Sequence, residues 1–164
     1  GFVDWRPFEH PQLGAVEIGG WNRILRNNAP PQLLEETCEK MARFLAAHAQ
    51  ASPKLRAEFH EVEKVGEGVY RIAVAVRNEG YLPTNVTKQA VKMEQAPPVE
   101  ARILLGEGDE LLGGEVKEEI GHLGGYGGRR KVEWMVRFAG EVGGTVEIVS
   151  KKAGVVRLDL AEAL

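Results

Sequence analysis

The chain has 164 residues, of which 27% are charged, and a formal net charge of −3 at pH 7. This length allows one complete hydrophobic core, so we expect one domain with an appendage. The net negative charge gives no electrostatic reason to expect a nucleic-acid partner. No run approaches the ~20 apolar residues of a membrane span, so we expect none. Cys38 is the only cysteine, which excludes an internal disulfide.

Residues 2–31 form an unusual opening stretch that holds Trp5, Trp21 and half of the prolines. The stretch is too rich in proline for a regular helix and too apolar for a disordered linker. We therefore expect an extended segment that packs on this domain or on a partner domain. Gly1 stands where an initiator methionine would be, which indicates a piece of a longer protein.

One amphipathic helix is predicted over residues 31–49, because Pro31 suits the first helical position and two glutamates follow near the positive end of the helix dipole. Apolar residues recur along it at helical spacing. We expect this stripe to pack against a sheet or another domain. Residues 2–53 are therefore treated as one region, an extended segment followed by a helix.

Residues 54–164 carry a β pattern, and the strand at residues 69–77 is its most constrained part. Tyr70, Ile72, Val74 and Val76 share one parity, which is typical of a strand with one buried face. We place this strand centrally in an antiparallel β-sandwich of Ig-like topology. The other predicted strands cover residues 55–65, 86–93, 99–105, 111–120, 132–138, 145–150 and 155–160.

His60 and Glu63 match the H-x-x-E spacing of a zinc ligand pair. On a regular strand, residues three apart point to opposite faces, so we predict that these two do not share an ion. The glycine-rich segment 121–130 could suggest a phosphate loop, but a strand follows it instead of a helix. We predict no metal site and an ordinary loop between strands.

Glu17 is the one carboxylate worth considering as a general base. It stands in Val16-Glu17-Ile18-Gly19-Gly20, a short strand-like run before a glycine pair, where it could face a cleft. The alternative is an exposed strand residue or one that hydrogen-bonds to a loop. The residues by themselves favour this alternative.

Three stretches resemble the C-terminal region of large bacterial zinc carboxypeptidases of the carboxypeptidase A type. They are His10-Pro11-Gln12-Leu13-Gly14, the Val16 to Gly20 run, and Asn78-Glu79-Gly80-Tyr81-Leu82-Pro83-Thr84. The resemblance runs through nearly the whole chain. It implies a metallopeptidase hydrolase whose preceding catalytic domain holds the zinc.

The resemblance implies that this chain is a non-catalytic accessory domain, because the zinc ligands of that family are missing from it. Its partner would be its own N-terminal catalytic domain, with a possible homodimer as a second association. Residues 2–53 would then form the seam between domains, through Trp5, Phe8, His10 and Trp21. Under the same resemblance Glu17 remains a candidate general base. The resemblance also implies that the protein is extracellular or periplasmic.

The alternative function is an independent carbohydrate- or protein-binding module of a cell-surface protein. A row of exposed aromatic side chains on a sheet face or loop rim would favour it. In the predicted sandwich only Trp134 beside Met135, and Tyr81 with Tyr126, could supply such a row. We expect each to be core or corner packing instead.

Overall fold

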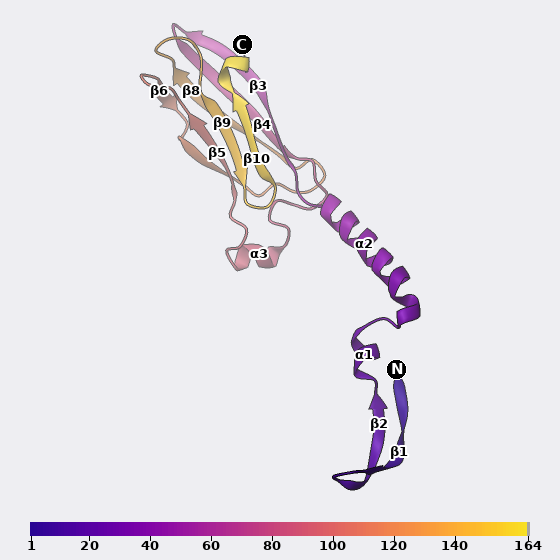
Figure 1. The fold of residues 1–164 in the computed structure, drawn as a ribbon. Helices are drawn as coiled ribbons and strands as arrows, with labels where there is room; N and C mark the ends of the chain where they lie inside the picture. The colour runs from indigo at the N-terminus through magenta and orange to yellow at the C-terminus, as the bar shows by residue number, and fades with distance from the viewer. Residues whose placement is uncertain (164) are drawn as a thin grey trace. The chain divides into compact units, whose positions relative to one another are not determined.

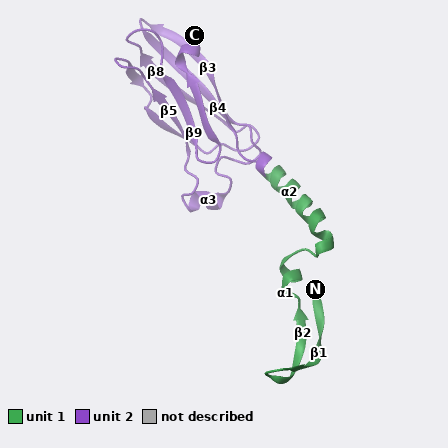
Figure 2. Ribbon diagram, viewed as in Figure 1, with its two compact units in different colours: residues 1–48 green, residues 49–164 purple. Residues whose placement is uncertain are grey.

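The computed structural model describes residues 1–163. The chain divides into two compact units, Gly1–His48 and Ala49–Leu164 (Figure 2). Each unit is described by itself.

The first unit contains a β-hairpin followed by helices. The hairpin joins β1 (Phe2–His10) to β2 (Gly14–Trp21), and α1 (Arg23–Asn27), the 3₁₀ turn η1 (Pro31–Leu33) and α2 (Leu34–Gln50) follow. His10 closes the hairpin turn, since its Nδ1 accepts hydrogen bonds from the backbone N–H groups of Gln12 at 3.1 Å and Leu13 at 3.2 Å. The predicted helix is confirmed, and the extended segment proves to be paired strands.

The two faces of the hairpin differ in composition. The register places Phe8 opposite Val16 and Arg6 opposite Ile18 on one face, where the Trp5 ring also lies 3.3 Å from the position a Cβ on Gly20 would take. Glu17 and Trp21 lie on the other face, because alternate residues of a strand point to opposite sides. We call the first of these the Trp5 face; its apolar members are Val3, Trp5, Phe8, Val16 and Ile18.

The second unit is an antiparallel β-sandwich (Figure 1). Its first sheet has the order β3-β4-β8-β6, formed by β3 (Leu55–Gly66), β4 (Val69–Asn78), β8 (Arg129–Arg137) and β6 (Glu110–Gly113). Its second sheet has the order β10-β9-β5-β7, formed by β10 (Gly154–Asp159), β9 (Thr145–Ser150), β5 (Val99–Leu104) and β7 (Lys117–Gly121). A short 3₁₀ turn, η2 (Leu160–Ala163), follows β10. The predicted mainly β, antiparallel sandwich is therefore confirmed.

The strand order matches the immunoglobulin type. One sheet holds the equivalents of strands A, B, E and D, and the other holds G, F and C, with β7 added beside β5. The chain reaches β7 directly from β6 by crossing between sheets at Gly114, whose φ is +85°. The predicted strand over residues 111–120 is thus two short strands in different sheets.

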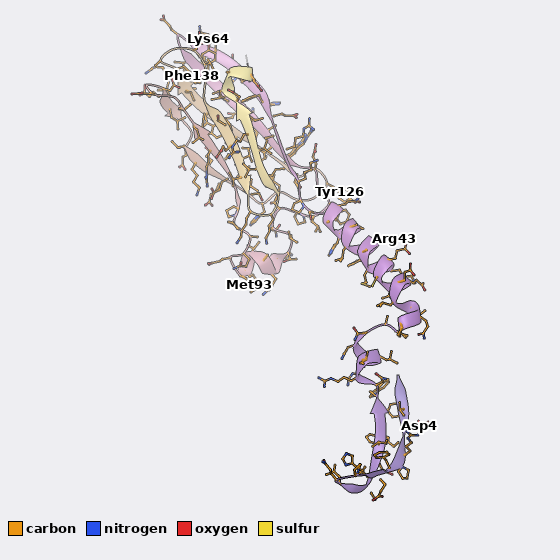
Figure 3. The ribbon with its side chains drawn as sticks, in the orientation of Figure 1. Asp4, Arg43, Lys64, Met93, Tyr126 and Phe138 are labelled. Carbon is orange, nitrogen blue, oxygen red and sulfur yellow. The ribbon has the colours of Figure 1, made fainter. Side chains whose placement is uncertain are left out.

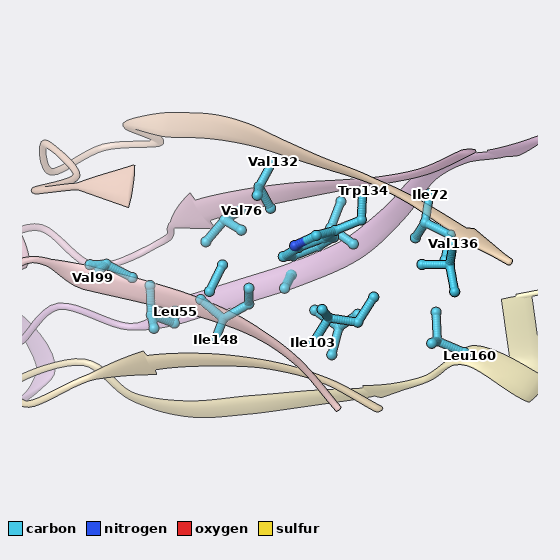
Figure 4. Close-up of a cluster of buried hydrophobic side chains, with 14 of the residues drawn as sticks. Leu55, Ile72, Val76, Val99, Ile103, Val132, Trp134, Val136, Ile148 and Leu160 are labelled. Carbon is cyan, nitrogen blue, oxygen red and sulfur yellow. The ribbon is translucent and has the colours of Figure 1, made fainter. Parts of the chain in front are cut away.

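The core lies between the two sheets. In Figure 4, Val132, Trp134 and Val136 of the first sheet face Ile103 and Ile148 of the second. Trp134 is only 1% exposed, and its Nε1–H donates to the backbone carbonyl of Glu115 at 2.8 Å. That bond satisfies the indole at the crossover, which explains how so large a polar-tipped ring can be buried.

One predicted strand is wrong. Residues 86–93 contain a helical turn, α3 (Lys88–Lys92), in place of a strand. Thr87 caps this turn, because its side chain accepts a hydrogen bond from the backbone N–H of Ala90 at 3.1 Å, and Val86 before it has a positive φ of 61°. The local cap therefore overrides the β-branched residues that favoured a strand.

The reason given for separating His60 from Glu63 is also wrong. The ladder between β3 and β4 shifts at His60, since Phe59 pairs with Val74 and Glu61 with Ala73. This bulge adds one residue and places His60 and Glu63 on the same outer face of the sheet. There the Glu63 carboxylate forms an ion pair with Arg71, with 2.5 Å between Oε2 and Nη2.

Candidate functional site

One end of the sandwich is organised by the buried side chain of Asn78 at the end of β4. Its Oδ1 accepts hydrogen bonds from the backbone N–H groups of Lys54 and Gly80, both at 3.0 Å. Its Nδ2 donates to the backbone carbonyls of Leu82 at 2.7 Å and Gly124 at 3.0 Å. Asn78 thereby joins three segments, 51–54, 78–84 and 121–128, which we call the loop end of the sandwich.

Close backbone approaches also hold the loop end. A Cβ on Gly125 would lie 1.9 Å from the carbonyl oxygen of Tyr81, and one on Gly80 would lie 2.2 Å from that of Ser52. Thr84 and Leu123 exchange hydrogen bonds at 2.9 Å, one between their backbones and one to the Thr84 hydroxyl. The Asn78 to Thr84 motif and the glycine-rich segment are thus parts of one structure.

Two tyrosines project from the loop end. Tyr81 is 57% exposed and Tyr126 is 81% exposed, and their rings meet edge to face with centroids 4.8 Å apart. Tyr126 has a positive φ of 54°, which is uncommon for a bulky residue. Its N–H donates to the carbonyl of Gly80 at 3.1 Å, so the loop holds the strained residue in place. Figure 3 shows Tyr126 and Phe138 at opposite ends of the sandwich.

A groove of about 750 Å³ lies on the outer face of β3, β4 and β8, next to this end. Ala75 contributes a small side chain to its lining, and Gly127 connects it to the Tyr126 loop. Four cationic side chains and the carboxylate of Glu58 line it as well. We call it the basic groove; its charged and titratable residues are Glu58, His60, Arg77, Arg129, Arg130 and Lys131.

The cations of the basic groove differ in how they are paired. Lys131 pairs with Glu133 at 2.6 Å, and this hydrogen-bonded lysine lowers the pKa of the Glu133 carboxyl. Arg77 lies 3.3 Å from Glu79. Among residues 1–163, no carboxylate pairs with Arg129 or Arg130. Two guanidinium groups without a carboxylate partner therefore lie at the start of β8, and Arg130 Nη1 donates to the backbone carbonyl of Arg129 at 3.0 Å.

Comparison with known proteins assigns the sandwich to a family. The family described as Domain of unknown function (DUF8731) matches residues 54–161, which is most of the chain. The chain belongs to this family. No curated protein matches it.

The DUF8731 match takes in the basic groove and, apart from residues 51–53, the loop end, but it begins after Glu17, which lies on β2 of the hairpin. Glu17 is exposed, and within residues 1–163 it forms no ion pair or side-chain hydrogen bond. Its role as a general base stays a prediction. Among the same described residues, no three His, Cys, Asp or Glu side chains gather closely enough to hold a metal ion.

The four seam residues do not form one surface. Trp5, Phe8 and His10 share the Trp5 face, where the Phe8 and His10 rings are 6.4 Å apart, whereas Trp21 lies on the other face and packs edge to face on Phe2 at 5.4 Å. The seam assignment itself stays a prediction. No helix within residues 1–163 has the length and apolar character needed to cross a membrane.

The sequence indicated some parts of this site better than others. The expectation of core or corner packing is right for Trp134, which lies in the core. Tyr81 and Tyr126 pack on each other at the loop end, but both rings are largely exposed to solvent. The role of Asn78 is not predictable from the sequence, since nothing in a sequence shows that one amide joins three loops. Arg129 and Arg130 are adjacent in the sequence, but the groove beside them depends on the register of β8 against β4.

Proposed function

We propose that this chain is a non-catalytic accessory β-sandwich domain, and that residues 1–48 dock it onto a separate folded domain. The observation that carries this proposal is the composition of the first unit. None of residues 1–48 is buried, and even the large apolar side chains are exposed: Trp5 is 61% and Trp21 66% exposed. A unit so rich in aromatic side chains, with no core of its own, requires a covering surface.

The energetics of small structures support this proposal. An isolated two-stranded hairpin is at best marginally stable in water, and it needs a further layer on its apolar face. Burial of apolar area contributes about 25 cal/mol per Å², so covering the Trp5 face would stabilise the hairpin substantially. Aromatic side chains are also the residues most enriched at the centres of interfaces.

Helix α2 offers a second apolar surface. Its exposed side chains of helical spacing are Leu34, Met41 and Leu45, with Phe44 beside them. The ion pairs Lys40–Glu36 and Arg43–Glu39 lie on the same helix at the i, i+4 spacing. Charged residues on one side and apolar residues on the other are typical of a helix that packs on a partner.

The separate domain that we propose is a zinc carboxypeptidase catalytic domain of the carboxypeptidase A type. The support is the resemblance in the His10 to Gly14, Val16 to Gly20 and Asn78 to Thr84 stretches, two of which form the hairpin. The zinc would be held by that domain. The accessory domain would contribute docking, stability, or binding of substrate or surface, in an extracellular or periplasmic enzyme.

Reading the gene upstream of the Gly1 codon tests this proposal directly. We expect an open reading frame that encodes H-x-x-E and a distant histidine, which are the zinc ligands of the resembled family. An open reading frame without them would overturn the carboxypeptidase assignment.

Glu17→Gln in the complete enzyme separates docking from catalysis. If Glu17 is the general base, turnover is lost while zinc content and melting temperature stay unchanged. Glu9→Gln, a second exposed carboxylate of the hairpin, is the matched control. Intact turnover in the Glu17 variant would leave Glu17 with a structural role.

A further inference from the structure

The basic groove and the tyrosine pair lie together on the second unit, and neither is needed for docking through residues 1–48. Gly127 lines the groove and directly follows Tyr126, while Arg77 at the groove directly precedes Asn78. The N–H of Gly127 donates to the carbonyl of Asn78 at 2.9 Å, which fixes the tyrosine loop to the end of β4. The basic groove and the exposed tyrosine rings are therefore held at the same end of the sandwich.

We propose that this surface binds an acidic polysaccharide, a chain of sugar rings that carry carboxylate groups. Arg129 and Arg130 have no carboxylate partner among residues 1–163, and a guanidinium group binds a carboxylate through two parallel hydrogen bonds. The register places Arg129 opposite Arg77 and Lys131 opposite Ala75. Arg77, Arg129 and Lys131 thus share the outer face across two strands, with the small Ala75 beside them. Arg130 lies opposite Val76, on the parity of the core residues, and reaches the lining of the groove at the end of the strand.

The tyrosine pair favours sugar rings over an acidic peptide. Tyr126 is held at a positive φ while its ring is almost fully exposed, and such strain persists where the surrounding structure enforces it. An exposed aromatic ring offers a flat apolar face on which the C–H face of a sugar ring can lie. The loop therefore maintains a costly conformation that exposes this ring at the end of the sandwich where the basic groove lies.

The sheet beneath the groove gives a second reason. Peptides commonly bind β domains by adding a strand to a free edge. The backbone of β4 is already paired with β3 on one side and β8 on the other, so it has no free edge to which a peptide strand could add. A ligand on this face must be recognised by side chains alone, which suits a polymer whose polar groups lie on its rings.

The test is a titration of the complete chain with oligogalacturonate, with the methyl-esterified oligomer of equal length as the uncharged control. We expect saturable binding of the acid form only, and weakening as salt concentration rises. In the wild-type protein, amide NMR signals of residues 126–131 should shift on titration. Absence of binding, equal binding of the ester, or shifts confined to other residues would overturn the proposal.

Two variants assign the binding to this surface. Replacing Arg129 and Arg130 together by alanine should weaken binding by at least about tenfold, because two charge-assisted contacts are lost. Replacing Lys151 and Lys152, an exposed pair at the turn between β9 and β10, makes the same change in net charge and should leave affinity unchanged. Equal weakening by both pairs would show general attraction between charges and would overturn the site.

Tyr126→Gly tests the contribution of the ring. Glycine adopts a φ of 54° without strain, so the loop should keep its conformation and the melting temperature should not fall. We expect oligogalacturonate affinity to fall several-fold. A poly-glutamate peptide is the competing ligand: if it binds as tightly as the sugar, or if Tyr126→Gly leaves sugar affinity unchanged, the ligand class is wrong.

Discussion

Asn78 is the residue whose side chain joins the three segments of the loop end. Replacing it by alanine removes four side-chain hydrogen bonds and leaves the backbone N–H groups of Lys54 and Gly80 and the carbonyls of Leu82 and Gly124 without that partner. We predict a loss of unfolding free energy on the order of 3 kcal/mol, measured by urea denaturation.

Asn85→Ala is the matched control for this variant. The Asn85 amide makes only a local hydrogen bond, to the carbonyl of Thr87 at 3.2 Å. Its replacement should change the free energy of unfolding by no more than about 0.5 kcal/mol. Equal effects of the two substitutions would contradict the role given to Asn78.

Glu100 on β5 should make stability depend on pH. Hydrogen bonds from Lys117 at 2.8 Å and Arg102 at 2.6 Å lower the pKa of its carboxyl below the ordinary value of 4.5. Because the pKa is lower in the folded state, the stabilisation is complete above the unfolded-state pKa and disappears as pH falls through the folded-state pKa.

The measurement is the urea midpoint of Glu100→Gln against the wild type across acidic pH. We predict that the variant is less stable at pH 7 and that the difference closes below the ordinary glutamate range. Glu118→Gln on the neighbouring strand β7 serves as control. A difference that stays constant with pH would show that the charge of Glu100 is not responsible.

At the level of elements, the crossover between β6 and β7 is the feature most sensitive to a small change. A Cβ on Gly114 would lie 2.8 Å from Cδ1 of Trp134 and 2.9 Å from the carbonyl oxygen of Glu133, at a φ of +85°. Gly114→Ala therefore combines backbone strain with a steric clash against the core tryptophan. We predict a destabilisation of about 2 to 3 kcal/mol, measured by chemical denaturation.

Gly140→Ala provides the comparison for the crossover, since nothing lies within 4 Å of the position its Cβ would take. We expect its unfolding free energy to stay within about 0.5 kcal/mol of the wild type. If Gly114→Ala were tolerated as well, the crossover would be more adaptable than its packing indicates.

Strand periodicity predicted the sandwich because parity is a local property of the chain. The runs at residues 69–77 and 145–150 alternate cleanly and correspond to β4 and β9. Residues 86–93 were placed wrongly because one capping threonine outweighs the β-branched residues near it. The bulge at His60 was missed because an extra residue in a ladder is defined by its partner strand.

The site was less predictable than the fold. Its parts come from β3, β4, β8 and two loops, and only their pairing brings Arg77 and Arg129 together. The sequence predicts an extended segment but not the hairpin or its Trp5 face. Both depend on which residues of β1 and β2 lie opposite each other, and that register is not visible in the sequence. The exposure of Tyr81 and Tyr126 likewise follows from a tertiary contact, the close approach of the Tyr81 backbone to Gly125.

For the whole molecule, we propose two separable properties. Residues 1–48 would hold the domain to its partner, and the sandwich would carry the polysaccharide surface. A surface that is uncovered when its partner is missing tends to self-associate. We therefore expect the isolated chain to form homodimers through residues 1–48, and sedimentation should show dissociation when Trp5 and Phe8 are both replaced by alanine.

The most direct measurement is binding in trans between this chain and the proposed catalytic domain, produced separately, followed by sedimentation velocity. We predict a stable complex with the wild-type chain. We predict loss of that complex when Trp5 and Phe8 are replaced by alanine, and no change for Met93→Ala, an exposed apolar residue of the sandwich unit. A complex that survives the Trp5 and Phe8 replacements, or no complex with the wild type, would contradict docking through the hairpin.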